Sequence, residues 1–252
     1  MPSPGVKARI DRFWRAIRRL EELSSVDAER YITMKMTFAN FLAELCERYE
    51  GADVDVITRA IGTDSRIGVK YFKGGPSYGG PCFPRDNRAV ALVAERAKVN
   101  SSLPKLIDSL NRHYTERIAE IINQNLKENS TVTILGLTYK PNTNIIEESV
   151  GVNLSNILLK FGNYNLKLYD PLAKDSLKQV FKDKRVKICE DIHEAIKDTD
   201  AIVITVLHKE LEELPNMIKD DREILIIDCW RNFKNRFSNK VKYYALGIGK
   251  KK

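Results

Sequence analysis

Short runs of apolar, mostly β-branched residues alternate with helix-like segments from residue 131 onward, and this alternation constrains the fold more than any other feature. We interpret the runs as strands over residues 132–137, 166–169, 186–188, 201–206 and 224–228. The segments between them predict helices over residues 152–161, 175–181, 192–197 and 210–218. Strands that alternate with helices in this way predict a parallel sheet covered on both faces.

The carboxyl ends of parallel strands form the edge at which such sheets bind their ligands. We therefore expect the functional edge of this sheet in the segments that follow Leu137, Tyr169, Val206 and Asp228.

The first half of the chain has the apolar periodicity of helices. Apolar residues recur at three- and four-residue spacing across residues 6–49, and similar patterns predict helices over residues 55–61, 86–97 and 103–126. The pattern changes near residues 127–131. We therefore expect two domains, a helical one over residues 1–128 and an α/β one over residues 129–252.

One segment, residues 74–86, sets Cys82 among four glycines and three prolines, with Asp86 four positions later. We call it the cysteine bend. Glycines let a ligand approach the backbone closely, and prolines hold the bend rigid. If a helix starts near Pro84, its dipole favours a thiolate at its N-terminal end. Cys82 is therefore a candidate nucleophile, and the alternative is a structural turn with a buried cysteine.

The net charge bears on the class of partner. The 252 residues carry a formal charge of +8, spread along the chain without aromatic interleaving or a nucleic-acid motif. We expect a solvated basic surface or a site for a phosphorylated ligand, and we expect no nucleic acid to bind.

The sequence also argues against membranes and metals. It has no run of about 18 apolar residues, and its basic start lacks the apolar core of a secretory signal. Its four cysteines and three histidines are scattered without a C-x-x-C pair, so we expect no metal site. Scattered thiols suit a reducing cytoplasm.

Several motifs resemble, in order and in register, those of the UDP-glucose/GDP-mannose dehydrogenase family. The cysteine bend is similar to that family's cysteine motif, and residues 64–68 (Asp-Ser-Arg-Ile-Gly) are similar to its Asp-x-Arg-Ile-Gly. Residues 34–47 resemble its central helix. Further segments resemble its C-terminal domain, namely residues 136–143, 169–171 and 228–232. The match covers about residues 20–249, and several ordered motifs are far more specific than one glycine-rich loop.

The resemblance implies a helical central domain with a long dimerisation helix, followed by a Rossmann-like parallel-sheet domain that binds UDP. In the family, the C6 alcohol of a nucleotide sugar is oxidised twice to an acid, two NAD⁺ are consumed, and a cysteine carries the thiohemiacetal and thioester. Cys82 would be that nucleophile. Asp86 would assist proton transfer or position water.

The resemblance also implies a set of substrate-binding residues. The bend would run along the sugar and phosphates, tyrosines would contact the nucleotide, and basic side chains would pair with the diphosphate. Arg66 would reach into the site of a second subunit, because relatives dimerise through their central helices. The implied residues are Arg66, Tyr71, Lys73, Gly75, Ser77, Tyr78, Gly79, Tyr139, Lys140 and Arg231.

Structural alternatives remain open for four of these residues. Arg231 could be a surface arginine, and Arg66 could belong to a helix end. Lys140 could cap the edge of the preceding strand, and Tyr139 could pack in the core.

Two departures from the family pattern matter. Nothing before Met34 shows the strand, G-x-G-x-x-G turn and helix of the family's NAD-binding domain, so that domain is expected to be absent from this chain. In an ungapped alignment Glu22 matches the family's glutamate, but Ser25 stands at the position of its catalytic lysine and Glu29 at that of its asparagine. In the family, that lysine and asparagine stabilise the developing oxyanion.

Two functions follow from these observations. The chain could be part of a nucleotide-sugar 6-dehydrogenase that takes a UDP-sugar and forms a homodimer through its central helices. Its NAD-binding domain could then lie on a separate chain or could have been cut from this sequence. Alternatively, it could be a dimeric nucleotide-sugar-binding protein without redox activity.

Overall fold

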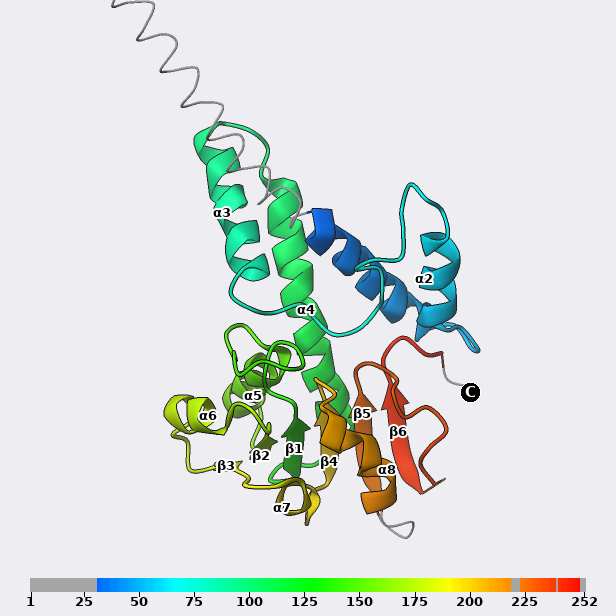
Figure 1. Cartoon of the computed structure of the whole chain (residues 1–252). Coiled ribbons are helices and arrows are strands. Elements are labelled where there is room, and N and C mark those ends of the chain that lie inside the picture. Colours follow the sequence, from blue (N-terminus) through cyan, green and yellow to red (C-terminus); the bar gives the residue numbers. More distant parts are fainter. Residues whose placement is uncertain (1–30, 219–222, 239, 250–252) are drawn as a thin grey trace, which may run out of the picture.

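The computed structural model describes residues 31–218, 223–238 and 240–249, and helices precede strands along the chain (Figure 1). A helix over residues 31–46 comes first; the rest of the predicted helical segment, residues 6–30, lies outside the described residues. The next helices are α2 (Val54–Gly62), α3 (Phe83–Arg96) and α4 (Ser102–Asn125). These confirm the three helices predicted between residues 55 and 126.

Within the described residues a sheet of six parallel strands follows. Its strands are β1 (Thr131–Leu135), β2 (Asn165–Tyr169), β3 (Val186–Ile188), β4 (Ala201–Ile204), β5 (Ile224–Asp228) and β6 (Val241–Ala245). Their order is β3-β2-β1-β4-β5-β6, so the direction of winding reverses between β1 and β4. This is the order of doubly wound Rossmann-type sheets. The predicted α/β class with a parallel sheet is confirmed.

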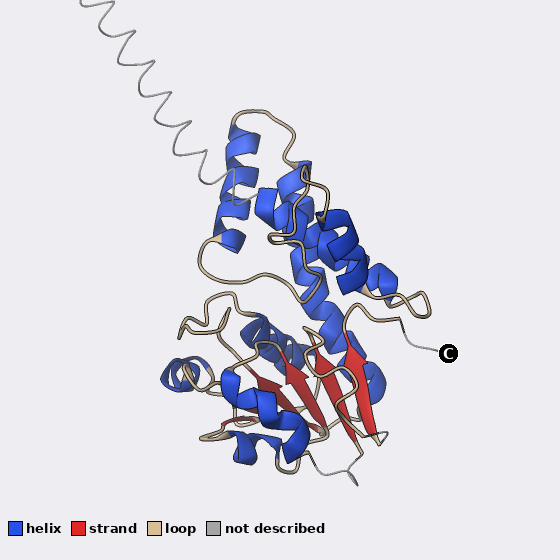
Figure 2. Ribbon diagram, turned by 45° about the vertical axis from the view of Figure 1, so that its right-hand side comes forward, coloured by secondary structure: helices blue, strands red, loops and turns tan. Residues whose placement is uncertain are grey.

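Helices cover both faces of the sheet (Figure 2). Successive strand residues point to opposite faces, so Val203 belongs to one hydrophobic core and Ile204 to the other. The first core includes residues of α4 and α5, and the second includes residues of α7, η1 and α8. The helices of this part are α5 (Val150–Phe161), α6 (Lys174–Val180), α7 (Ile192–Ile196), the 3-10 helix η1 (Lys209–Glu213) and α8 (Leu214–Met217).

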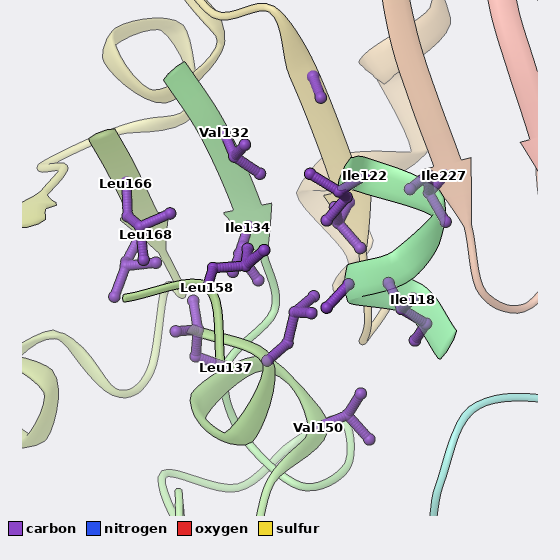
Figure 3. Packing of buried hydrophobic residues seen from close by; sticks show 14 of the residues in the cluster. Ile118, Ile122, Val132, Ile134, Leu137, Val150, Leu158, Leu166, Leu168 and Ile227 are labelled. Atoms are coloured by element: carbon purple, nitrogen blue, oxygen red, sulfur yellow. The ribbon is translucent and has the colours of Figure 1, made fainter. Parts of the chain in front are cut away.

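The long helix α4 joins the helical part to the sheet. Its 24 residues extend over about 36 Å. Ile118 and Ile122, near its C-terminal end, are fully buried and pack in the same core as Val132 and Ile134 of β1 (Figure 3). The N-terminal half of α4 packs instead against α3 (Figure 1). One helix therefore belongs to both parts of the molecule.

A second junction joins the helical part to the end of the sheet. The Glu47 carboxylate accepts hydrogen bonds from Arg117 of α4, from the Tyr244 hydroxyl of β6 and from the backbone N–H of Gly247, at 2.7–2.8 Å. The backbone N–H of Val54 also donates to the Gly247 carbonyl oxygen at 3.0 Å. The start of α2 is therefore hydrogen-bonded to the segment that follows β6.

The structure differs from the sequence-based expectation at two elements. The strand β6 was not predicted, because it is half-polar and lies at the sheet edge, where only one neighbour pairs with it. The single helix predicted over residues 210–218 is instead η1 followed by the short α8, whose first turn contains Pro215. Among the described helices, none is long and apolar enough to cross a bilayer.

We predict that Ile118→Ala lowers the free energy of unfolding by about 2–5 kcal/mol, because it leaves a cavity where α4 meets the sheet. Urea denaturation measures the change. The matched control is Leu106→Ala on the same helix, where the side chain is 56% exposed and the expected loss is below about 1 kcal/mol. Equal losses in the two variants would show that α4 is not anchored in this core.

Candidate functional site

A cavity of about 600 Å³ lies between the cysteine bend and the carboxyl edge of the sheet. Its lining includes residues 76–83 of the bend, residues 139–141 after β1, residues 205–207 after β4, and Trp230 with Asn232 after β5. Because β1 and β4 flank the reversal in strand order, the cavity lies where sheets of this type bind their ligands. Of the segments predicted for the functional edge, those after Leu137, Val206 and Asp228 form one wall of this cavity, whereas the segment after Tyr169 is not part of its lining.

Cys82 is exposed, lines the cavity and is the N-cap residue of α3. Pro84 occupies the first turn of α3, where the absent N–H would have had no partner in the helix. The N-terminal end of a helix favours negative charge beside it. The condition set for a favoured thiolate, a helix that starts near Pro84, is met, because α3 begins at Phe83, three residues before the predicted start at residue 86. The thiol is not buried.

Asp86 lies one turn into α3. Its backbone N–H donates to the Cys82 carbonyl oxygen at 2.8 Å. Its carboxylate accepts a hydrogen bond from Nε of Arg85 at 2.9 Å and is not part of the cavity lining. The structure therefore brings Asp86 next to Cys82 along the helix but pairs its carboxylate with a neighbouring cation.

Two buried asparagines hold the backbone of the cysteine bend. Asn40 accepts the N–H of Gly75 at 2.9 Å and donates to the Pro76 carbonyl oxygen at 3.0 Å. Asn111 of α4 accepts the N–H of Tyr78 and donates to its carbonyl oxygen, both at 2.9 Å. Each amide thus satisfies one donor and one acceptor of a segment that has no regular secondary structure.

A further polar contact fixes the middle of the bend. The hydroxyls of Ser77 and Thr115 lie 2.6 Å apart, and both residues are buried. The predicted substrate-binding role of Ser77 therefore competes with a hydrogen bond inside the protein.

The loop after β1 packs directly on the bend. The Gly80 N–H donates to the Glu147 carbonyl oxygen at 3.1 Å. A Cβ atom at Gly79 would lie 2.2 Å from the carbonyl oxygen of Glu148, and one at Gly80 would lie 2.6 Å from the Tyr139 ring. Gly80 also has φ +89°, a conformation that other residues rarely adopt. Only glycine allows this close approach.

Two lysines and two aromatic rings are part of the cavity lining. The Lys73 ammonium lies 5.8 Å from the centre of the Trp230 ring, and the Lys140 ammonium lies 5.3 Å from the Tyr139 ring. Gly75 packs against Trp230, because a Cβ atom there would lie 2.6 Å from that ring. Cations beside flat apolar faces suit a ligand that combines phosphates with a planar base.

Tyr71 also lines the cavity, from the loop before the bend, and the centres of its ring and of the Phe83 ring lie 6.4 Å apart in a T-shaped arrangement. Of the predicted substrate-binding residues, the cavity brings together Tyr71, Lys73, Ser77, Tyr78, Gly79, Tyr139 and Lys140.

Behind the cavity wall, the carboxylate of Asp170 organises the turn after β1. It accepts hydrogen bonds from the N–H groups of Leu137 and Thr138 at 2.7 and 2.9 Å, and its Oδ2 lies 3.1 Å from His208 Nε2. Burial raises the pKa of Asp170, but the hydrogen bonds from His208 and the backbone outweigh it, so the pKa is lowered below its ordinary value.

Within the described ranges, no group of three His, Cys, Asp or Glu side chains could hold a metal ion.

Two arginines proposed as ligand-binding residues lie outside the cavity. Arg66 is highly exposed and pairs with Asp64 at 2.6 Å. Arg231 is buried, and its guanidinium pairs with Asp55 at 2.8 Å rather than lining the cavity. This geometry gives no support to a diphosphate contact for Arg231, nor to the alternative of a surface arginine.

The three polar positions of the central-helix motif, Glu22, Ser25 and Glu29, lie outside the described residues. Lys35, ten positions after Ser25, donates to the carbonyl oxygens of Ile67 and Lys70 at 2.8 and 2.7 Å. It therefore holds the loop that carries the Asp-x-Arg-Ile-Gly motif.

Sequence reasoning did not single out Asn40, Asn111 or Thr115 for the site. A signal exists for Asn111, because it interrupts the apolar stripe of α4 between Ile107 and Tyr114 and is buried there. A buried amide on an apolar helix face must find hydrogen-bond partners, and here it finds them in the bend.

Two family models match the chain. The central-domain model of the UDP-glucose/GDP-mannose dehydrogenase family matches residues 21–113, and the UDP-binding-domain model of the same family matches residues 133–235. A UDP-glucose 6-dehydrogenase of Rickettsia prowazekii is 30% identical in an alignment of 237 residues that covers 90% of this chain and 53% of that protein. One of Bacillus subtilis is 30% identical over 197 residues, covering 77% of this chain and 42% of that protein. The chain thus spans about half the length of these relatives.

Solved structures of similar fold agree. A UDP-glucose dehydrogenase from Pyrobaculum islandicum superposes with a TM-score of 0.78 at 26% identity, over 90% of this chain and 51% of that one. A UDP-D-ManNAc dehydrogenase from Pyrococcus horikoshii superposes with a TM-score of 0.73 at 20% identity, over 90% of this chain and 52% of that one, and shows a shared fold.

We predict that Asp170→Asn lowers the free energy of unfolding by about 2–3 kcal/mol at pH 7, because charge-assisted hydrogen bonds to the turn after β1 are lost. Since the folded pKa lies below the ordinary value near 4, this contribution is full above about pH 4 and is lost as the pH falls through the folded pKa. The difference between wild type and variant should therefore shrink below about pH 4 in urea titrations. Asp175→Asn, at an exposed position of α6, is the control; a difference for Asp170→Asn that is independent of pH would contradict the assignment.

Proposed function

Because the chain belongs to the UDP-glucose/GDP-mannose dehydrogenase family, we propose that its cavity binds a UDP-sugar with the sugar C6 beside Cys82. One observation carries the proposal: a single cavity joins an exposed thiol at a helix N-terminus to the lysines and aromatic rings of the sheet edge. The diphosphate would lie between Lys73 and Lys140, and Tyr71, Tyr139 or Trp230 would contact the planar base.

The described residues do not fit NAD, the cofactor that the family implies. A dinucleotide cradle needs a glycine-rich turn that leads from a strand directly into a helix N-terminus. After β1, α5 begins only at Val150, and Asp170 already takes the N–H groups of Leu137 and Thr138. We therefore assign no hydride-transfer step to these residues and propose that NAD is bound outside them.

The chemistry proposed for this chain is covalent catalysis by Cys82. Its thiolate sulfur would bond to the C6 aldehyde carbon while the carbonyl π pair moves to oxygen, which takes up a proton. The adduct would become a thioester only when a hydride acceptor outside these residues takes the hydride from C6. Water would then add to the thioester carbonyl, and the thiolate would leave as the sugar acid forms. Asp86 would position that water or accept its proton once a ligand displaces Arg85.

We propose that the protein works as a homodimer. One face of the helix over residues 31–46 exposes large apolar side chains at three- and four-residue spacing, and such a patch on a globular protein marks an interface. Its members are Tyr31, Met34, Phe38, Phe41 and Leu45. Arg66 is exposed and does not line the cavity of its own chain. A residue that reaches into the site of a second subunit must meet both conditions. Sedimentation velocity tests the dimer, and a monomer at micromolar concentration would count against it.

We predict that UDP binds this chain and that Lys140→Met weakens binding about 10- to 100-fold, because a charge-assisted contact to phosphate is worth about 1.5–3 kcal/mol. The affinity for uridine, which lacks phosphates, should fall less than threefold in Lys140→Met. Isothermal titration calorimetry measures both affinities. Lys160→Met, an exposed lysine of α5 outside the cavity, is the control; no binding of UDP at millimolar concentration would refute the proposed site.

We further predict that the chain, mixed with a separately supplied NAD-binding chain of the family and UDP-glucose, produces NADH, measured by absorbance. Cys82→Ser should stop the reaction before the acid forms, because the thioester cannot form. Binding of UDP-glucose without NADH from any such mixture would favour the alternative function, a nucleotide-sugar-binding protein without redox activity.

A further inference from the structure

The guanidinium of Arg231 makes more contacts than a simple ion pair. Its Nε and Nη2 atoms donate to the two carboxylate oxygens of Asp55 at 2.8 Å. Nη2 also donates to the Gly74 carbonyl oxygen at 2.7 Å, and Nη1 donates to the Leu246 carbonyl oxygen at 2.8 Å. The side chain is only 2% exposed. A planar, fork-shaped cation can serve both oxygens of a carboxylate and two carbonyl groups together, which takes more N–H donors than the three of a lysine.

These contacts connect segments that are distant in sequence. Arg231 follows β5, Asp55 lies in the first turn of α2, and Gly74 is the first residue of the cysteine bend. The residues on either side of Arg231, Trp230 and Asn232, line the cavity. The guanidinium therefore lies behind the cavity wall and ties that wall to the start of the bend.

The backbone of Arg231 supports this interpretation. Its φ of +63° lies in the left-handed region, which non-glycine residues seldom occupy. Such a conformation persists only where surrounding contacts fix it, and strained residues of this kind gather at functional sites. Here the contacts to Asp55, Gly74 and Leu246 direct the side chain away from the cavity, toward the helical part.

The other end of the bend is fastened to the same part of the molecule. The Gly80 N–H donates to the Glu147 carbonyl oxygen in the loop after β1. The bend that presents Cys82 is thus held to the sheet edge at Gly74 through Arg231 and at Gly80 through Glu147. A shift of either loop would move the thiol relative to the ligand-binding edge.

We propose that Arg231 is a positioning residue, which together with Asp55 fixes the cysteine bend so that Cys82 is held in register with the sheet edge. Whether this positioning serves catalysis rests on the proposed function. The effect of the pair on the bend and on the thiol does not depend on that function. It predicts that the Arg231–Asp55 pair controls the order of the bend and the reactivity of the thiol, and that it contributes little to the affinity for nucleotide.

The test compares Asp55→Asn and Arg231→Lys with Lys234→Met in the full chain. Lys234 is a matched control, because its ammonium pairs with Asp53 at 2.9 Å across the same junction rather than with the bend. Hydrogen exchange followed by mass spectrometry measures how well the backbone amides of residues 72–83 are protected. Residues 114–122 of α4 serve as the internal reference. Alkylation by iodoacetamide, resolved by peptide, reports the reactivity of Cys82, and calorimetry reports the affinity for UDP.

We expect Asp55→Asn and Arg231→Lys each to speed amide exchange in residues 72–83 at least fivefold and to slow alkylation of Cys82 at least threefold. Exchange in residues 114–122 and the affinity for UDP should change less than twofold, and Lys234→Met should leave all four readouts unchanged. The double variant should do no more than the more severe single variant, because both substitutions break one contact.

Three results would overturn the proposal. Unchanged exchange in the bend, or an equal effect of Lys234→Met, would show that the pair does not position the bend. Loss of protection in residues 114–122 in both variants would show a general role in stability instead. A tenfold loss of UDP affinity in Arg231→Lys but not in Asp55→Asn would make Arg231 a phosphate ligand. Failure of UDP to bind wild type would refute the proposed function alone, since exchange and alkylation are measured without ligand.

Discussion

The hydrogen bonds that fix the cysteine bend are the constraint on which the rest of the site depends. A segment of glycines and prolines forms no ladder of its own, so its backbone N–H and carbonyl groups need partners elsewhere. Asn40 and Asn111 supply them from two helices, and Arg231 and the loop after β1 supply them from the α/β part. Cys82 is presented to the cavity because this segment, which has no regular secondary structure, is held at several points.

The helix α4 makes that arrangement possible. Its N-terminal half packs against α3, its middle carries Asn111 to the bend, and its C-terminal end places Ile118 and Ile122 in the core of the sheet. The distance between the thiol and the sheet edge is therefore set by one rigid element about 36 Å long, supported by the contacts of Glu47 and Arg231 on the other side. A ligand with a sugar at one end and a nucleotide at the other requires such a fixed separation.

Features that depend on the local sequence pattern were predictable from the sequence. Runs of β-branched residues predicted β1 to β5, and the helix predicted over residues 86–97 corresponds to α3, which begins three residues earlier beside Cys82. Contacts between distant residues were not predictable from pattern. Asp55 and Arg231 are 176 positions apart, and nothing local indicates that they meet. The same holds for Asn40, whose partners in the bend lie 35 positions away. Such pairings depend on how the helical part sits on the sheet, which composition and periodicity do not specify.

The central claim is that one cavity holds the nucleotide at the sheet edge and the sugar at Cys82. A crystal structure of the chain with UDP-glucose tests it most directly. We expect electron density for the diphosphate beside Lys140, with the sugar C6 within about 4 Å of the Cys82 sulfur. A bound nucleotide whose sugar points away from Cys82, or one bound outside the cavity, would contradict it.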